Sequence, residues 1–87
     1  MRYFKRYWDE PRFGPGSEWG CSWWYFETGP AGVVSRHVKI YDAGPTLRYS
    51  TDRPLDEHGF LADQPLDLTE FAKFEIARAD FEETWGG

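Results

Sequence analysis

Glycine and proline cut the first half of this chain into short segments, and this division limits most strongly what the chain can fold into. The breakers gather at residues 11–20, 29–32 and 44–45. The stretches between them are rich in aromatic and β-branched residues, a composition typical of strands joined by turns. We therefore predict antiparallel strands over residues 2–8, 21–28, 33–42 and 45–51.

The second half of the chain gives weaker signals. Residues 52–64 are predicted to form a long loop, residues 66–71 a helical turn and residues 74–76 a short fifth strand.

Phe81 and Trp85 are four positions apart, so they share one face of a helix predicted over residues 78–85. Gly86-Gly87 is predicted to stop this helix. The fold class is therefore α+β, a four- to five-stranded antiparallel sheet with one short C-terminal helix, in a single domain over residues 1–87.

Aromatic residues must supply most of the core of a domain this small. The chain holds five Trp, five Tyr and seven Phe, and each buried ring removes about 150–250 Å² from water. Cys21 is the only cysteine, so no internal disulfide contributes. The chain shows no secretory signal and no apolar run long enough to span a membrane. We expect a cytoplasmic protein that binds no membrane and carries no cofactor.

Turn chemistry predicts which side chains share a face of the sheet. We assume a three-residue loop within residues 29–32 and a two-residue turn at Ala43-Gly44. The predicted inward face then holds Trp24, Phe26, Val38, Ile40, Leu47 and Tyr49. The predicted outward face holds Trp23, Tyr25, His37, Lys39, Tyr41 and Arg48. A four-residue first loop would instead exchange the faces of Trp23 and Trp24.

Part of the outward face forms the predicted partner-binding surface: Trp23, Tyr25, His37, Lys39 and Arg48. Trp, Tyr and Arg dominate the binding energy of protein interfaces. Lys39 and Arg48 are predicted to lie opposite one another, and an acidic partner would relieve their repulsion. The competing interpretation is that residues 52–64 fold over this face and neutralise its bases with their own acids.

Charge disfavours nucleic acid as the partner. The net charge is −5, and binding to phosphate depends on Lys and Arg. Residues 1–51 hold seven Lys/Arg and five Asp/Glu, whereas residues 52–87 hold three and ten. We predict no nucleic-acid binding, and an acidic C-terminal half that could attract a basic partner.

No cofactor or metal motif is complete. The glycines at positions 14, 16 and 20 miss the dinucleotide fingerprint, because position 19 is Trp. The acids of residues 52–64 lack the spacing of a calcium loop, and two His with one Cys do not make a zinc site. His58, beside Asp56 and Glu57, is the one candidate for acid–base chemistry.

The chain resembles a family of short bacterial proteins known only as a domain of unknown function. The resemblance rests on RYFK at residues 2–5, RHVKIYDAG at 36–44, FEI at 74–76 and DFEETW at 80–85. The chain departs from the family at Ala77, where relatives often have Ser as the helix N-cap. The resemblance implies no activity and no site residue.

These observations predict a non-enzymatic protein-binding module, a regulatory or immunity-type partner, with no catalytic residue. The alternative is a small-molecule binder or weak hydrolytic enzyme around His58. A pocket that holds His58 next to a Trp would favour the alternative, and a fully exposed His58 would exclude it. A homodimer through the outward face is compatible with either function.

Overall fold

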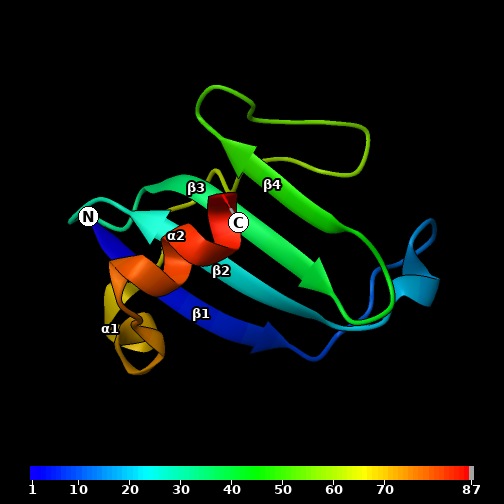
Figure 1. Ribbon diagram of the computed structural model, residues 1–87, viewed down its shortest axis with the longest axis horizontal. Helices are drawn as coiled ribbons and strands as arrows, with labels where there is room; N and C mark the ends of the chain where they lie inside the picture. The colour runs from blue at the N-terminus through cyan, green and yellow to red at the C-terminus, as the bar shows by residue number, and fades with distance from the viewer. Residues whose placement is uncertain (87) are drawn as a thin grey trace.

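Four antiparallel strands form the sheet in the computed structural model, which describes residues 1–86 (Figure 1). They are β1 (Arg2–Trp8), β2 (Ser22–Thr28), β3 (Val34–Tyr41) and β4 (Thr46–Ser50), and each pairs with the next along the chain. Their bounds agree with the four predicted strands to within one residue at each end. The predicted α+β fold class is confirmed.

The remaining regular elements are short helices. η1 (Ser17–Trp19) lies in the first long loop, and α1 (Leu68–Phe71), η2 (Ala72–Phe74) and α2 (Arg78–Gly86) follow the second. The helix predicted near the C-terminus is α2, and Gly86 is its last residue. Gly87, the other half of the predicted stop, lies outside the described residues. No helix among residues 1–86 has the length and apolar character needed to cross a membrane.

The fifth strand predicted over residues 74–76 is wrong. Glu75 makes only an isolated bridge with Phe4 of β1. The reason is local: the Glu75 N–H donates to the carbonyl oxygen of Ala72 and closes a 3₁₀ turn, and α2 begins at Arg78. Too little extended chain remains between these helices to pair along β1.

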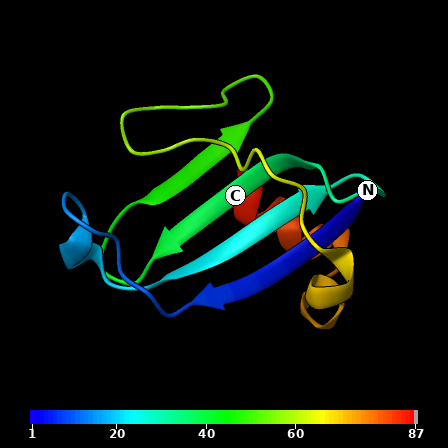
Figure 2. The same ribbon diagram turned by 180° about the vertical axis from the view of Figure 1, so that it is seen from behind.

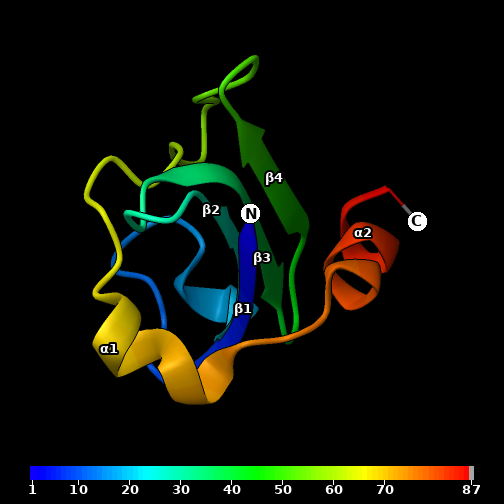
Figure 3. The ribbon, with the colours of Figure 1, turned by 90° about the vertical axis from the view of Figure 1, so that its left-hand side faces the viewer.

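The sheet separates two layers. Figure 3 shows the sheet nearly edge-on, with α2 on one side and α1 with the long loops on the other. In Figure 2, which is turned by 180° from Figure 1, the side with the loops faces the viewer. We call the side under α2 the helix face; it carries Tyr3, Tyr25, Val38 and Ile40, which pack with Phe81 of α2. The other side, the loop face, carries Phe4, Phe26, Leu47 and Tyr49.

The register of β3 differs from the prediction. The predicted three-residue loop is present, because Thr28 pairs with Val34, but the next pair is Glu27 with Arg36. Ser35 is thus an extra residue in a β-bulge, and everything after it changes face. The loop face therefore receives His37, Lys39 and Tyr41, and the helix face receives Val38 and Ile40.

The second turn is also one residue longer than predicted, because Ile40 pairs with Thr46 instead of Leu47. The two one-residue shifts cancel at β4. Leu47 and Tyr49 therefore share a face with Trp24 and Phe26, as predicted. Only β3 has its two faces exchanged.

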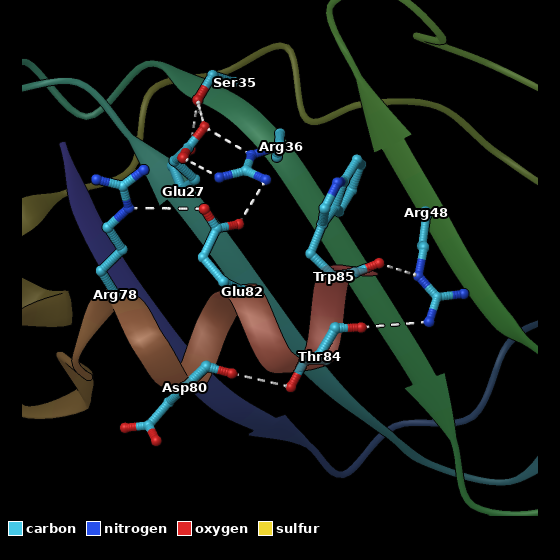
Figure 4. Close-up of polar contacts among 9 residues, drawn as sticks. All are labelled: Glu27, Ser35, Arg36, Arg48, Arg78, Asp80, Glu82, Thr84 and Trp85. Atoms are coloured by element: carbon cyan, nitrogen blue, oxygen red, sulfur yellow. Dashed lines mark hydrogen bonds and ion pairs between the residues drawn. The ribbon is translucent and has the colours of Figure 1, made fainter. Parts of the chain in front are cut away.

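An ion-pair network ties α2 to the helix face (Figure 4). The guanidinium of Arg36 donates through two nitrogens to the carboxylate of Glu27 and through the third to Glu82 of α2, at 2.7 Å. The same guanidinium lies over the rings of Phe81 and Trp85, 4.9 and 5.2 Å from their centroids. Hydrogen bonds from Arg36, opposed by burial, lower the pKa of Glu27 to about 2. The carboxylate is therefore ionised and paired beneath the helix.

Candidate ligand-binding site

The five residues predicted to bind a partner do not share one face. Trp23, Tyr25 and Arg48 lie on the helix face, whereas His37 and Lys39 lie on the loop face because of the bulge in β3. Lys39 and Arg48 are therefore not opposite one another, and the predicted outward face is wrong as a single surface. The role of these residues in partner binding stays a prediction.

Two of the three helix-face residues have partners within the fold. The Arg48 guanidinium donates to the last two backbone carbonyl oxygens before Gly86, at the C-terminal end of α2 (Figure 4). Tyr25 packs into the cluster beneath α2. Trp23 is 39% exposed, and its ring lies 4.9 Å from that of Tyr7. Arg48 is also exposed, but its guanidinium is bonded to α2, so Trp23 is the exposed aromatic member of this group that is open to a partner.

The two loop-face residues line a pocket. Its volume is about 350 Å³, within the range of small-molecule sites. Two strands, β2 and β3, and two loops, one before η1 and one after β4, form its wall. The lining residues are Arg12, Trp24, His37, Lys39, Tyr41, His58, Gly59, Phe60 and Ala62, and none of them is acidic.

Asp56 holds the loop that forms one side of this pocket. Its Oδ1 accepts hydrogen bonds from the Tyr49 hydroxyl at 2.9 Å and from the backbone N–H groups of His58 and Gly59 at 2.8 and 3.1 Å. Arg12 donates from the other loop to the carbonyl oxygen of His58. These hydrogen bonds within the protein therefore hold the two loops that form the wall of the pocket.

His37 is a buried polar group without a partner. Its side chain is 1% exposed, and neither ring nitrogen has a hydrogen-bond partner among residues 1–86. The ring stacks on Phe26 at a centroid distance of 4.4 Å. Burial, together with the charge of Lys39, lowers the pKa of His37 to about 3. The imidazole is therefore neutral near pH 7, with one N–H donor and one acceptor nitrogen.

Two cations of the pocket have no ionic partner. Among residues 1–86, neither Lys39 nor Arg12 forms an ion pair. The Nζ of Lys39 lies 4.5 Å from the centroid of the Trp24 ring, and the guanidinium of Arg12 lies 5.2 Å from that of Trp19. Burial and then repulsion from Arg12 lower the pKa of Lys39, against an opposing attraction from Asp56.

His58 lies at this pocket beside a tryptophan. Its ring is edge-on to that of Trp19 at a centroid distance of 5.4 Å, and its Nε2 is 3.5 Å from the Glu57 carboxylate. The side chain is only partly exposed. This arrangement meets the condition under which the sequence favours the small-molecule alternative.

The chemistry of the pocket follows from its two kinds of group. Lys39 and Arg12 offer charged hydrogen-bond donors, which suit an anionic group on a ligand. The exposed ring of Phe60 offers flat apolar surface, which suits an aromatic or aliphatic body. The site therefore suits a molecule that carries both an anionic group and an apolar body.

Sequence reasoning missed several members of this site, among them Arg12 and Trp24. Arg12 sits in a loop rich in Gly and Pro, where no periodicity fixes the direction of a side chain, so the sequence carries no signal for it. For Trp24 the sequence does carry a signal, which is the length of the first loop. The four-residue first loop, left open as an alternative, would place Trp24 on the same face as His37 and Lys39, which is where the bulge places it.

Comparison of the chain with protein-family models, with curated proteins and with solved structures finds no match. The resemblance to a bacterial family of unknown function therefore stays a prediction. Within residues 1–86, no group of three or more His, Cys, Asp or Glu residues could hold a metal ion. The functional interpretation rests on the geometry and charge of the pocket.

Proposed function

We propose that this protein is a non-enzymatic binding domain whose loop-face pocket takes a small organic anion with a flat apolar body. The observation that supports this most is the lining of the pocket, where Lys39 and Arg12 have no ionic partner among residues 1–86 and no acid is present. An anion in the pocket would supply the partner that these two cations lack.

The charge of the pocket lining indicates that the ligand is negatively charged. The chain carries a net charge of −5, yet the pocket lining holds Lys39 and Arg12 and no acid. The acid behind the wall, Asp56, uses its Oδ1 in three hydrogen bonds. An anion would accept hydrogen bonds from the two cations, whereas a cation would be repelled.

Binding is favoured over hydrolysis by the composition of the lining. It contains no carboxylate, Ser or Cys, the groups that hydrolytic enzymes commonly use as acid or nucleophile. A His37 pKa of about 3 makes this imidazole a weak general base at neutral pH. A cytoplasmic location and a homodimer stay predictions beside this proposal.

A panel of aromatic carboxylates, their neutral amides and the matching amines would test the pocket. We expect the carboxylates alone to raise the melting temperature, because a ligand that binds only the native state adds RT ln(1 + [L]/Kd) to its stability. Lys39→Met should weaken carboxylate binding about tenfold, which equals about 1.4 kcal/mol. Thermal shift and tryptophan fluorescence would measure both effects.

Lys73→Met is the matched control, because it removes the same charge from an exposed position on η2. This variant should bind carboxylates as the wild type does. Equal weakening by the two variants would contradict the proposal, as would amides or amines that bind as tightly as the carboxylates.

Protein binding is the second candidate, and an exposed aromatic pair on the helix face supports it. Trp23 and Tyr7 are both exposed and in contact. The Nζ of Lys5 lies 4.6 Å from the centroid of the Trp23 ring. Exposed aromatic residues beside a cation suit a partner with an acidic surface.

Trp23→Ala should abolish capture of such a partner by the tagged protein and leave the fold intact, because Trp23 lies outside the buried core. Phe13→Ala is the control, since Phe13 is also an exposed ring. Affinity capture at low and high salt, with mass spectrometry, would compare the two variants with the wild type. A partner retained equally by both variants would count against this surface.

A further inference from the structure

Lys39 differs from the other two lysines of the chain in its surroundings. Lys5 lies over the Trp23 ring on the helix face, and Lys73 is exposed on η2. Lys5 lines hollows of its own that include acids, and like Lys39 it forms no ion pair among residues 1–86. Lys39 differs because its pocket holds a second cation, Arg12, and no acid. Its amine is therefore held beside a space that a small molecule can enter.

Arg12 lines the same pocket but cannot do the same chemistry. A guanidinium stays protonated in proteins, whereas a lysine amine can lose its proton and become a nucleophile. Burial and the nearby charge of Arg12 lower the pKa of Lys39, which increases the fraction of free amine. One cation is thus suited to hold a carboxylate, and the other to react with a carbonyl group.

We propose that Lys39 forms a reversible imine with a small molecule that carries a carbonyl group beside a carboxylate, and that Arg12 binds the carboxylate. This inference rests on the proposed function, since it uses the same pocket and the same sign of ligand. The apolar surface of Phe60 would contact the substituent on the far side of the carbonyl.

The reaction consumes no oxidant or reductant. The Nζ lone pair attacks the carbonyl carbon, and the π electrons of the C=O bond move to oxygen. Transfer of a proton from nitrogen to oxygen gives a carbinolamine. The hydroxyl then takes up a proton from solvent and leaves as water while the nitrogen lone pair forms the C=N bond. Loss of one proton from nitrogen to solvent gives the imine.

The test uses phenylpyruvate as the probe on the wild-type chain, with sodium cyanoborohydride to reduce any imine to a stable amine. Peptide mass spectrometry then compares the adduct on Lys39 with that on Lys5 and Lys73 of the same molecules. We expect most of the adduct on Lys39 at neutral pH, because its lowered pKa increases the fraction of free amine and Arg12 would hold the carboxylate beside it. Arg12→Gln should lower labelling of Lys39 and leave that of Lys5 unchanged.

Equal labelling of the three lysines would overturn the imine proposal, and so would a preference for Lys5 or Lys73. Phenyllactate, which has a hydroxyl in place of the carbonyl, separates this proposal from the proposed function. If phenyllactate raises the melting temperature but phenylpyruvate leaves no adduct on Lys39, the pocket binds anions without imine chemistry. If neither compound binds, both proposals fail.

Discussion

Replacing Arg36 by methionine should lower the free energy of unfolding by about 3–5 kcal/mol, the cost of removing one partner from a buried ion pair. The Glu27 carboxylate, in a residue 7% exposed, would lose both hydrogen bonds from the guanidinium. The same change would release Glu82 and so loosen α2 from the sheet. Urea unfolding followed by circular dichroism would measure the loss.

Arg78→Met is the matched control for this prediction. Arg78 pairs with the same Glu82 at 3.6 Å, but its side chain is 75% exposed, so its removal should cost less than about 1 kcal/mol. If Arg36→Met lowered the free energy of unfolding no more than this control does, the ion pair between Arg36 and Glu27 would contribute little to stability. The apolar contacts of Phe81 and Trp85 would then be what holds α2 in place.

Acid should destabilise the fold through His37. In the unfolded chain this imidazole takes up a proton with its ordinary pKa of 6.5, whereas burial holds the folded pKa near 3. The unfolded state therefore binds more protons between these values, so stability falls as the pH falls. The contribution is complete above pH 6.5 and is lost on the way to pH 3, on the order of 5 kcal/mol in all.

Glu27 adds a second acid-sensitive contribution in a lower range of pH. Its pKa falls from an ordinary 4.5 to about 2 in the fold, so its stabilisation is complete above pH 4.5 and is lost as the pH falls towards 2. The two contributions can be separated, because only His37 acts between pH 6.5 and pH 5.

His37→Phe should remove the dependence of stability on pH in that upper range. The wild type should lose about 2 kcal/mol between pH 6.5 and pH 5, whereas the variant keeps its packing on Phe26 and has no imidazole to protonate. His58→Gln is the control and should keep the wild-type slope. Urea unfolding at several pH values would decide, and an identical slope in the wild type and His37→Phe would contradict the assignment.

The sequence was sufficient to predict the strands but not the face that each residue occupies. Gly and Pro mark the turns, so the bounds of all four strands could be predicted closely. A face depends on counting residues, and one unpaired residue reverses it. Val34, Val38 and Ile40 have the even spacing of one face, yet the bulge puts Val34 in the loop-face cluster and the other two under α2.

Ser35 shows why this bulge was missed. Its hydroxyl donates to the backbone carbonyl oxygen of Glu27 at 3.2 Å and to the Glu27 carboxylate at 2.6 Å. These contacts link neighbouring strands, and no local pattern in the sequence reports them. The same holds for Arg12, whose place in the pocket depends on a hydrogen bond to a residue 46 positions away. His37, Lys39 and His58 could be selected by residue type, but their meeting in one pocket could not.

The order of the strands has a consequence for how the chain folds. Each strand neighbours its successor, so the sheet assembles through hairpins and requires no long crossover. Docking of the C-terminal segment instead joins distant residues, 46 positions apart for Arg36 with Glu82 and 73 for Arg2 with Glu75. We expect these contacts to form after the main barrier. Weakening them would then shorten the lifetime of the folded state and leave the rate of its formation almost unchanged.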